Sequence, residues 1–128
     1  MSGPNIPVRP RILLVEDNRH QADALVLLLG SGFEVARAVD GREARARLAT
    51  DDSFDVILSD VRMPRMSGFA LLEWAREQRP VLERRFIFLT SEPSESVAQT
   101  LARTHPLLRK PAKPEELRAA IEAVLAKR

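Results

Sequence analysis

The sequence predicts an α/β fold in which helices cover both faces of a parallel sheet of five strands. Strand-like and helix-like segments alternate along the 128 residues, and this order is typical of a parallel sheet joined by right-handed crossovers. The central apolar run, residues 56–58, is continuous and bounded by polar residues, as expected for a strand buried on both faces. The length suits one domain with a substantial core.

The first elements follow a proline-rich leader. We expect residues 1–10 to be disordered, with the folded domain over residues 11–128. Residues 11–15 form the first apolar strand. Asp17 or Asn18 then caps a helix, because either side chain can accept a hydrogen bond from a backbone N–H of the first turn. The apolar stripe of that helix consists of Ala22, Leu25, Val26, Leu28 and Leu29, and the helix stops near residues 30–32.

The central strand ends at Asp60, and turn-forming residues follow it. Pro64 cannot continue a strand ladder, and Gly68 permits a tight turn before the next helix. Pro114 suits the first turn of a closing helix. The remaining strands are expected over residues 33–38, 85–89 and 105–108, and the remaining helices over residues 42–49, 69–79, 94–104 and 114–125.

The composition limits the classes of function. Hydrophobic residues make up 45% and charged residues 30% of the chain, which fits a globular protein. The chain has no cysteine, so disulfides and cysteine-bound metals are excluded, and we expect a cytoplasmic location. We find no signal peptide and no apolar run that would span a membrane. The net charge of +2, with arginines scattered among acidic residues, favours solvated helix surfaces, so neither a membrane nor nucleic acid is an expected partner.

Polar side chains come directly after four of the expected strands. They are the pair Glu16 and Asp17, then Asp60, Thr90 and Lys110. The carboxyl ends of parallel strands meet at one edge of the sheet, where ligands bind in such folds. Charges about 4 Å apart repel by roughly 4 kcal/mol at an effective dielectric near 20, so clustered carboxylates raise a pKa or hold a cation. Oxygen ligands without His or Cys indicate Mg²⁺, and the lysine and hydroxyl suit a phosphoryl group carried on a carboxylate.

Four motifs give the chain a family resemblance. They are LLVEDN at residues 13–18, SDVRMPRMSG at residues 59–68, FLTS at residues 88–91 and KP at residues 110–111. In this order and with these gaps, they make residues 11–125 resemble the receiver domain of two-component response regulators, such as the chemotaxis receiver. The resemblance implies the strand order 2-1-3-4-5 of the flavodoxin-like receiver fold.

The resemblance also implies roles for the residues at the strand ends. Asp60 matches the aspartate that takes a phosphoryl group from a histidine of a sensor histidine kinase or a histidine phosphotransfer protein. Glu16 and Asp17 match the acidic Mg²⁺ pair, and the backbone carbonyl of Arg62 matches a third metal contact. Thr90 matches the hydroxyl residue that turns toward the phosphoryl group, and Lys110 matches the lysine that pairs with that group.

Two departures from the family pattern concern the switch. A Tyr or Phe usually stands three residues before the lysine, and Leu107 stands there in this chain. An aromatic side chain therefore cannot report phosphorylation at this position, and we expect the switch to rely on Thr90 and on movement of residues 90–104 between two states. Ala112 follows the KP motif where Phe is common, so the output surface is expected to differ as well.

Two further pairs of side chains carry expectations. Arg62 and Glu92 stand two residues beyond the phosphoacceptor and the hydroxyl residue, where side chains flank the site in this family. We expect them either to form an ion pair across the mouth that tunes the lifetime of the phosphoryl group, or to be separate solvated side chains. His20 and His105 are expected to be surface or loop histidines.

The expected function is that of a receiver that accepts a phosphoryl group on Asp60 with Mg²⁺ and then switches partner binding. Such a domain is no conventional enzyme, although it catalyses its own phosphorylation and dephosphorylation. The chain ends soon after the closing helix, so we expect no output domain. We expect either a stand-alone regulator or a receiver from a hybrid histidine kinase. The closing helices are a candidate homodimer face. Two alternatives stay open, a phosphorylation-independent interaction module and a Mg²⁺-dependent phosphatase of small molecules. No second acid and no glycine-rich phosphate loop support the phosphatase.

Overall fold

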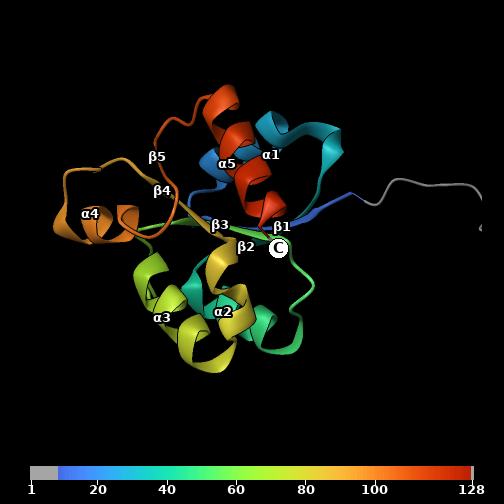
Figure 1. Cartoon of the computed structure of the whole chain (residues 1–128). Coiled ribbons are helices and arrows are strands. Elements are labelled where there is room, and N and C mark those ends of the chain that lie inside the picture. The colour runs from blue at the N-terminus through green and yellow to red at the C-terminus, as the bar shows by residue number, and fades with distance from the viewer. Residues whose placement is uncertain (1–8, 128) are drawn as a thin grey trace, which may run out of the picture.

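The computed structural model describes residues 9–127, and within them five parallel strands form one sheet (Figure 1). The strand order is β2-β1-β3-β4-β5, which confirms the predicted order 2-1-3-4-5. Because β3 lies at the centre, it is buried on both faces along its whole length, as its continuous apolar run predicts. The strands are β1 (Arg11–Val15), β2 (Glu34–Ala38), β3 (Val56–Asp60), β4 (Phe86–Thr90) and β5 (Leu107–Arg109).

Helices cover both faces of the sheet. In Figure 1, α1 and α5 lie above the sheet, α2 and α3 lie below it, and α4 lies to one side. No helix of the described chain is long and apolar enough to cross a membrane. The helices are α1 (Arg19–Leu29), α2 (Gly41–Thr50), α3 (Gly68–Gln78), α4 (Ser96–Ala102) and α5 (Pro114–Ala126), with short 3-10 helices η1 (Gly30–Gly32) and η2 (Pro80–Arg85).

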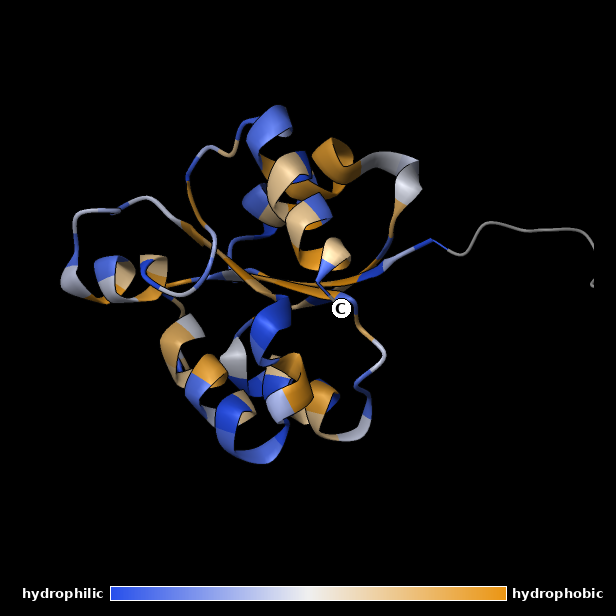
Figure 2. Cartoon of the chain, in the orientation of Figure 1, coloured by the Kyte–Doolittle hydropathy of each residue, from blue (hydrophilic) through white to orange (hydrophobic). Residues whose placement is uncertain are grey.

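The core consists of a hydrophobic cluster on each face, because successive side chains of a strand point to opposite sides. In β3, Ile57 packs into the cluster shared with α2 and α3, whereas Val56 and Leu58 pack into the cluster shared with α1 and α5. Figure 2 shows the consequence: the strands are largely apolar, and polar residues gather on the outer surfaces of the helices.

Side-chain caps set the starts of three helices. Asn18, rather than Asp17, caps α1, because its Oδ1 accepts a hydrogen bond from the backbone N–H of Gln21 at 3.0 Å. Ser67 caps α3 and Asp40 caps α2 in the same way. Because Asn18 supplies the cap of α1, the carboxylate of Asp17 can serve the sheet edge instead.

Asp40 also holds the loop that follows β3. Its Oδ1 accepts from the backbone N–H of Glu43 at 2.8 Å, and its Oδ2 lies 2.6 Å from Nε of Arg65. Both interactions lower the pKa of Asp40, and the hydrogen bond from the Glu43 N–H has the larger effect. Arg65 has a φ of 67°, the left-handed region that side chains other than glycine rarely adopt. One carboxylate therefore stabilises both a helix start and a strained loop residue.

The expectation for His105 is confirmed in part. It lies in the loop between α4 and β5, but it is not at the surface: it is buried, its Nε2 lies 2.9 Å from the carbonyl oxygen of Glu83, and its ring packs edge-on against Phe88. Glu83 belongs to η2, a short helix that the sequence pattern did not reveal. His20, by contrast, is exposed at the start of α1, as expected.

The leader expected over residues 1–10 lies mostly outside the described residues, which begin at residue 9. Pro10, the last residue of the expected leader, takes part in the fold. The carbonyl of Pro10 accepts a hydrogen bond from the backbone N–H of Glu34 at 2.9 Å, so pairing between the first two strands begins one residue before β1.

Two glycines permit close backbone approaches beside β3. A Cβ atom at Gly68 would lie 2.3 Å from the carbonyl oxygen of Asp60, and one at Gly41 would lie 2.3 Å from the carbonyl oxygen of Met66. Both obstacles are backbone atoms, which cannot move aside as a flexible side chain can. The loop between β3 and α3 is therefore packed against α2 and against the end of its own strand.

We expect Gly68→Ala to lower the free energy of unfolding by about 1–3 kcal/mol, because the added methyl group overlaps the Asp60 carbonyl. Urea denaturation followed by circular dichroism measures the loss. Gly32→Ala is the matched control, because a Cβ atom added there would have nothing within 4 Å. Equal losses for the two variants would show that the close approach is unimportant.

Candidate acidic site at the carboxyl edge of the sheet

The predicted polar residues lie together at the carboxyl edge of the sheet. Glu16 and Asp17 follow β1, Asp60 and Thr90 end β3 and β4, and Lys110 follows β5. All of them line one hollow of about 230 Å³. The parallel register explains the convergence, since each strand delivers its last side chains to the same edge. The other residues that line the hollow are Asn18, Gln21, Arg62 and Ser91.

Lys110 connects the members of the site. Its Nζ donates hydrogen bonds to Glu16 Oε1 at 2.7 Å, to Asp60 Oδ2 at 2.8 Å and to Gln21 Oε1 at 2.6 Å. An ammonium group has three protons, so each has an acceptor among the described residues. Gln21 is not among the site residues predicted from the sequence. No local pattern singled it out, because its partner Lys110 lies 89 residues away in the sequence.

Three acidic side chains form a cluster that could hold a metal ion. One carboxylate oxygen from each of Glu16, Asp17 and Asp60 lies within 4.8 Å of the others. Glu16 and Asp60 are buried, whereas Asp17 is exposed to solvent. Oxygen donors of this kind, with one side open for water, suit a hard divalent cation.

Burial and charge perturb the three central groups in different directions. Burial raises the pKa of Asp60 to about 7, because the hydrogen bond from Lys110 only partly opposes it and the negative charge of Glu16 adds to it. Burial acts in the same sense on Glu16, but hydrogen bonds from Lys110 and the Asn18 N–H outweigh it and lower the pKa. Burial disfavours the charged form of Lys110, but the interactions with Asp60 and Glu16 favour that form more strongly, so the pKa of Lys110 is raised.

Thr90 is buried, and its hydroxyl lies beside the cluster. Its Oγ1 accepts a hydrogen bond from the backbone N–H of Glu92 at 3.0 Å, and its own carbonyl accepts one from Lys110 N–H at 2.8 Å. Since Oγ1 accepts in the first of these bonds, its proton stays available for donation. Leu107, which stands where the family pattern has an aromatic residue, is half-buried against the α2 and α3 cluster.

The expected ion pair between Arg62 and Glu92 is wrong. Arg62 instead makes a two-pronged ion pair with Glu95, in which Nε lies 2.9 Å from Oε2 and Nη2 contacts Oε1. The reason is a turn before α4: the Glu95 N–H donates to the Glu92 carbonyl at 3.2 Å, and residue 95 is the one whose side chain reaches Arg62. The metal contact expected of the Arg62 carbonyl stays a prediction.

Comparisons with known proteins agree on one family. A family model described as the response regulator receiver domain matches residues 12–122. The transcriptional regulatory protein CpxR of Klebsiella pneumoniae is 40% identical over 120 residues, which cover 90% of this chain and 49% of that protein. The chain thus spans about half the length of such regulators.

Two solved structures, a chemotaxis protein and a receiver domain of a histidine kinase, share the fold. The chemotaxis protein CheY4 of Vibrio cholerae is 33% identical with a TM-score of 0.77, and the match covers 92% of this chain and 100% of that one. The receiver domain of a signal transduction histidine kinase from Syntrophus aciditrophicus is 31% identical with a TM-score of 0.77, over 92% of this chain and 91% of that one.

The raised pKa of Asp60 predicts an unusual pH dependence of stability in the metal-free protein. Between pH 4 and 7 the folded state holds a proton on Asp60 that the unfolded state has released, so the free energy of unfolding should fall as pH rises through this window, by at most about 1.4 kcal/mol per pH unit. Urea denaturation with a chelator at pH 5, 6, 7 and 8 measures this.

Asp60→Asn is the control for that experiment, since it keeps the shape and removes the titration. The variant should lack the decline and should be more stable than the wild type at pH 8. A wild-type stability that rises from pH 5 to pH 8 would contradict the prediction. The lowered pKa of Glu16 affects stability only below about pH 4.5, outside the range of pH 5 to 8 over which the urea denaturation is measured.

Proposed function

The chain belongs to the response regulator receiver domain family of two-component signalling, and from this premise we propose that it accepts a phosphoryl group on Asp60. The observation that carries the proposal is the position of Lys110, whose ammonium bridges Asp60 and Glu16 at the open edge of the sheet. A cation held against the acceptor carboxylate is what a transferred phosphoryl group needs, because negative charge on its oxygens must be balanced.

We assign Glu16, Asp17, Asp60 and the Arg62 carbonyl to Mg²⁺. The donor set supports the assignment, since it contains only oxygen atoms and includes an exposed member. A bound Mg²⁺ would offset negative charge on the transferred group and would favour the ionised form of Asp60, whose burial raises its pKa to about 7 in the metal-free site.

The transfer step uses groups of this chain in named roles. An oxygen of the Asp60 carboxylate attacks the phosphorus of a phosphohistidine on the donor protein. The new O–P bond forms an acyl phosphate, the P–N bond breaks, and its electron pair stays on the histidine nitrogen. Lys110 donates a hydrogen bond to one oxygen of the transferred group, and the Thr90 hydroxyl donates a hydrogen bond to another.

The partner that membership of this family implies is a histidine kinase, and we propose that a sensor histidine kinase or a histidine phosphotransfer protein supplies the phosphoryl group in the cytoplasm. Signal output would begin at Thr90, because its hydroxyl oxygen accepts a hydrogen bond from the backbone N–H of Glu92 and so holds the start of the segment that leads to α4. The half-buried Leu107 offers no aromatic ring to rotate, so we propose that the β4–α4 segment itself carries the change between two states.

Incubation with a small phosphodonor and Mg²⁺, followed by mass spectrometry, tests the proposal. We expect a mass increase of one phosphoryl group on the wild type and none on Asp60→Asn. Absence of label on both would favour a phosphorylation-independent interaction module. Sustained hydrolysis of unrelated phosphoesters by the wild type would favour a small-molecule phosphatase.

The Arg62–Glu95 ion pair yields a prediction about the lifetime of the phosphoryl group. The pair joins the β3–α3 loop to the start of α4, and we propose that it slows the approach of water to the phosphoryl group. Arg62→Ala and Glu95→Ala should each speed dephosphorylation by about two- to fivefold, the limit for an exposed ion pair worth up to about 1 kcal/mol.

Glu92→Ala is the matched control for this experiment, because Glu92 contributes its backbone and not its carboxylate to the contacts of the site. Its dephosphorylation rate should equal that of the wild type when the loss of label is followed by mass spectrometry. Unchanged rates in both Arg62→Ala and Glu95→Ala would rule out a tuning role for the pair.

A further inference from the structure

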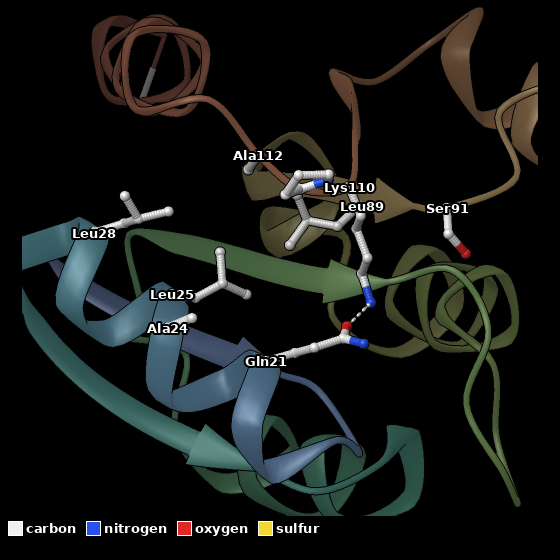
Figure 3. A pocket seen from close by; sticks show the side chains of 9 residues that line it. Gln21, Ala24, Leu25, Leu28, Leu89, Ser91, Lys110 and Ala112 are labelled. Atoms are coloured by element: carbon white, nitrogen blue, oxygen red, sulfur yellow. Dashed lines mark hydrogen bonds between the residues drawn. The ribbon is translucent and has the colours of Figure 1, made fainter.

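Gln21 stands between two hollows at the carboxyl edge of the sheet. One is the acidic hollow described above, and the other is an apolar hollow of about 350 Å³ between α1 and the segment after β5. Figure 3 shows Gln21 reaching from α1 toward Lys110, with a hydrogen bond between them. Both hollows are lined by Gln21, Ser91 and Lys110. The lysine ammonium therefore lies at the boundary between the acidic hollow and the apolar hollow.

The three acceptors of Lys110 differ in what the proposed reaction requires of them. Glu16 and Asp60 belong to the acidic cluster, and their oxygens are needed by a divalent cation and by the incoming phosphorus. Gln21 Oε1 is neutral and lies outside that cluster. It is therefore the acceptor that keeps its bond to Lys110 when the carboxylates take other partners.

The backbone holds Gln21 in a position suited to this task. Its N–H donates to the Asn18 side chain in the cap of α1, at 3.0 Å, which anchors the residue in the first turn of the helix. Lysine has a long flexible side chain that loses much rotamer freedom when it is held in one place. On the far side of Gln21, the apolar walls formed by Leu25 and Leu89 offer the ammonium no acceptor.

We propose that Gln21 is a positioning residue, which holds the Lys110 ammonium over Asp60 while a phosphoryl oxygen replaces the Asp60 carboxylate as its partner. This inference rests on the proposed phosphorylation of Asp60. Gln21 lines the acidic hollow but is not one of the three acidic residues of the cluster, so in this proposal it acts through the lysine. Its loss should therefore affect the rate of the transfer step and leave the binding of a small phosphodonor unchanged.

The test compares Gln21→Met, which keeps the length of the side chain and removes the acceptor, with Gln78→Met on the exposed end of α3. The maximal rate of phosphorylation by a small phosphodonor with Mg²⁺ should fall about fivefold in Gln21→Met, as expected for the loss of one hydrogen bond. The donor concentration at half-maximal rate should stay the same. Gln78→Met should match the wild type in both quantities.

A double-mutant comparison separates positioning from a general structural role. In a Lys110→Met background, Gln21→Met should have no further effect, because there is no ammonium left to position. A fivefold loss in that background as well, or a wild-type rate in the single variant, would overturn the inference.

A second readout does not depend on phosphorylation. In ¹⁵N-lysine spectra of the unphosphorylated protein, the Lys110 ammonium signal should be sharp in the wild type and broadened by exchange in Gln21→Met. An unaltered signal in Gln21→Met would overturn the inference. Absence of label on the wild type would overturn the proposed function instead, and the ammonium signal would then decide alone whether Gln21 positions Lys110.

Discussion

The site depends on one charge arrangement: a single ammonium group bridges two buried carboxylates that would otherwise repel each other. Lys110 is delivered by the last strand, Glu16 by the first and Asp60 by the central one, so its hydrogen bonds join three parts of the chain that are far apart in sequence. Burial, together with the repulsion from Glu16 that Lys110 does not fully offset, raises the pKa of Asp60 to about 7. The remaining imbalance is what a divalent cation would remove.

The fold supplies this arrangement through strand order. With β3 at the centre and β1 and β4 beside it, the last residues of these strands must be neighbours, whatever their side chains. The close approaches at Gly41 and Gly68 then hold the loop after Asp60 against α2, so the acceptor end of β3 has little freedom to move.

Most of the fold was accessible from the sequence, because continuous apolar runs and helical stripes are local patterns. The strand order and the roles at Glu16, Asp60 and Lys110 came from motif resemblance and could not be obtained from periodicity alone. Side-chain partners were harder: Glu92 and Glu95 are equally charged neighbours in sequence, and only the turn between them decides which meets Arg62. The partners of Gln21 and His105 likewise depend on segments 89 and 22 residues away.

Asp40 both caps α2 and pairs with Arg65, and this combination limits which residues can replace it. Serine, threonine and asparagine can each replace an aspartate as a helix cap, and glutamate can replace it as a partner for arginine. None of these combines a short capping reach with a full negative charge, and the backbone of Arg65 sits in a region that needs outside support. Variation at position 40 is therefore coupled to position 65: a neutral cap becomes acceptable once glycine or asparagine relieves the backbone there.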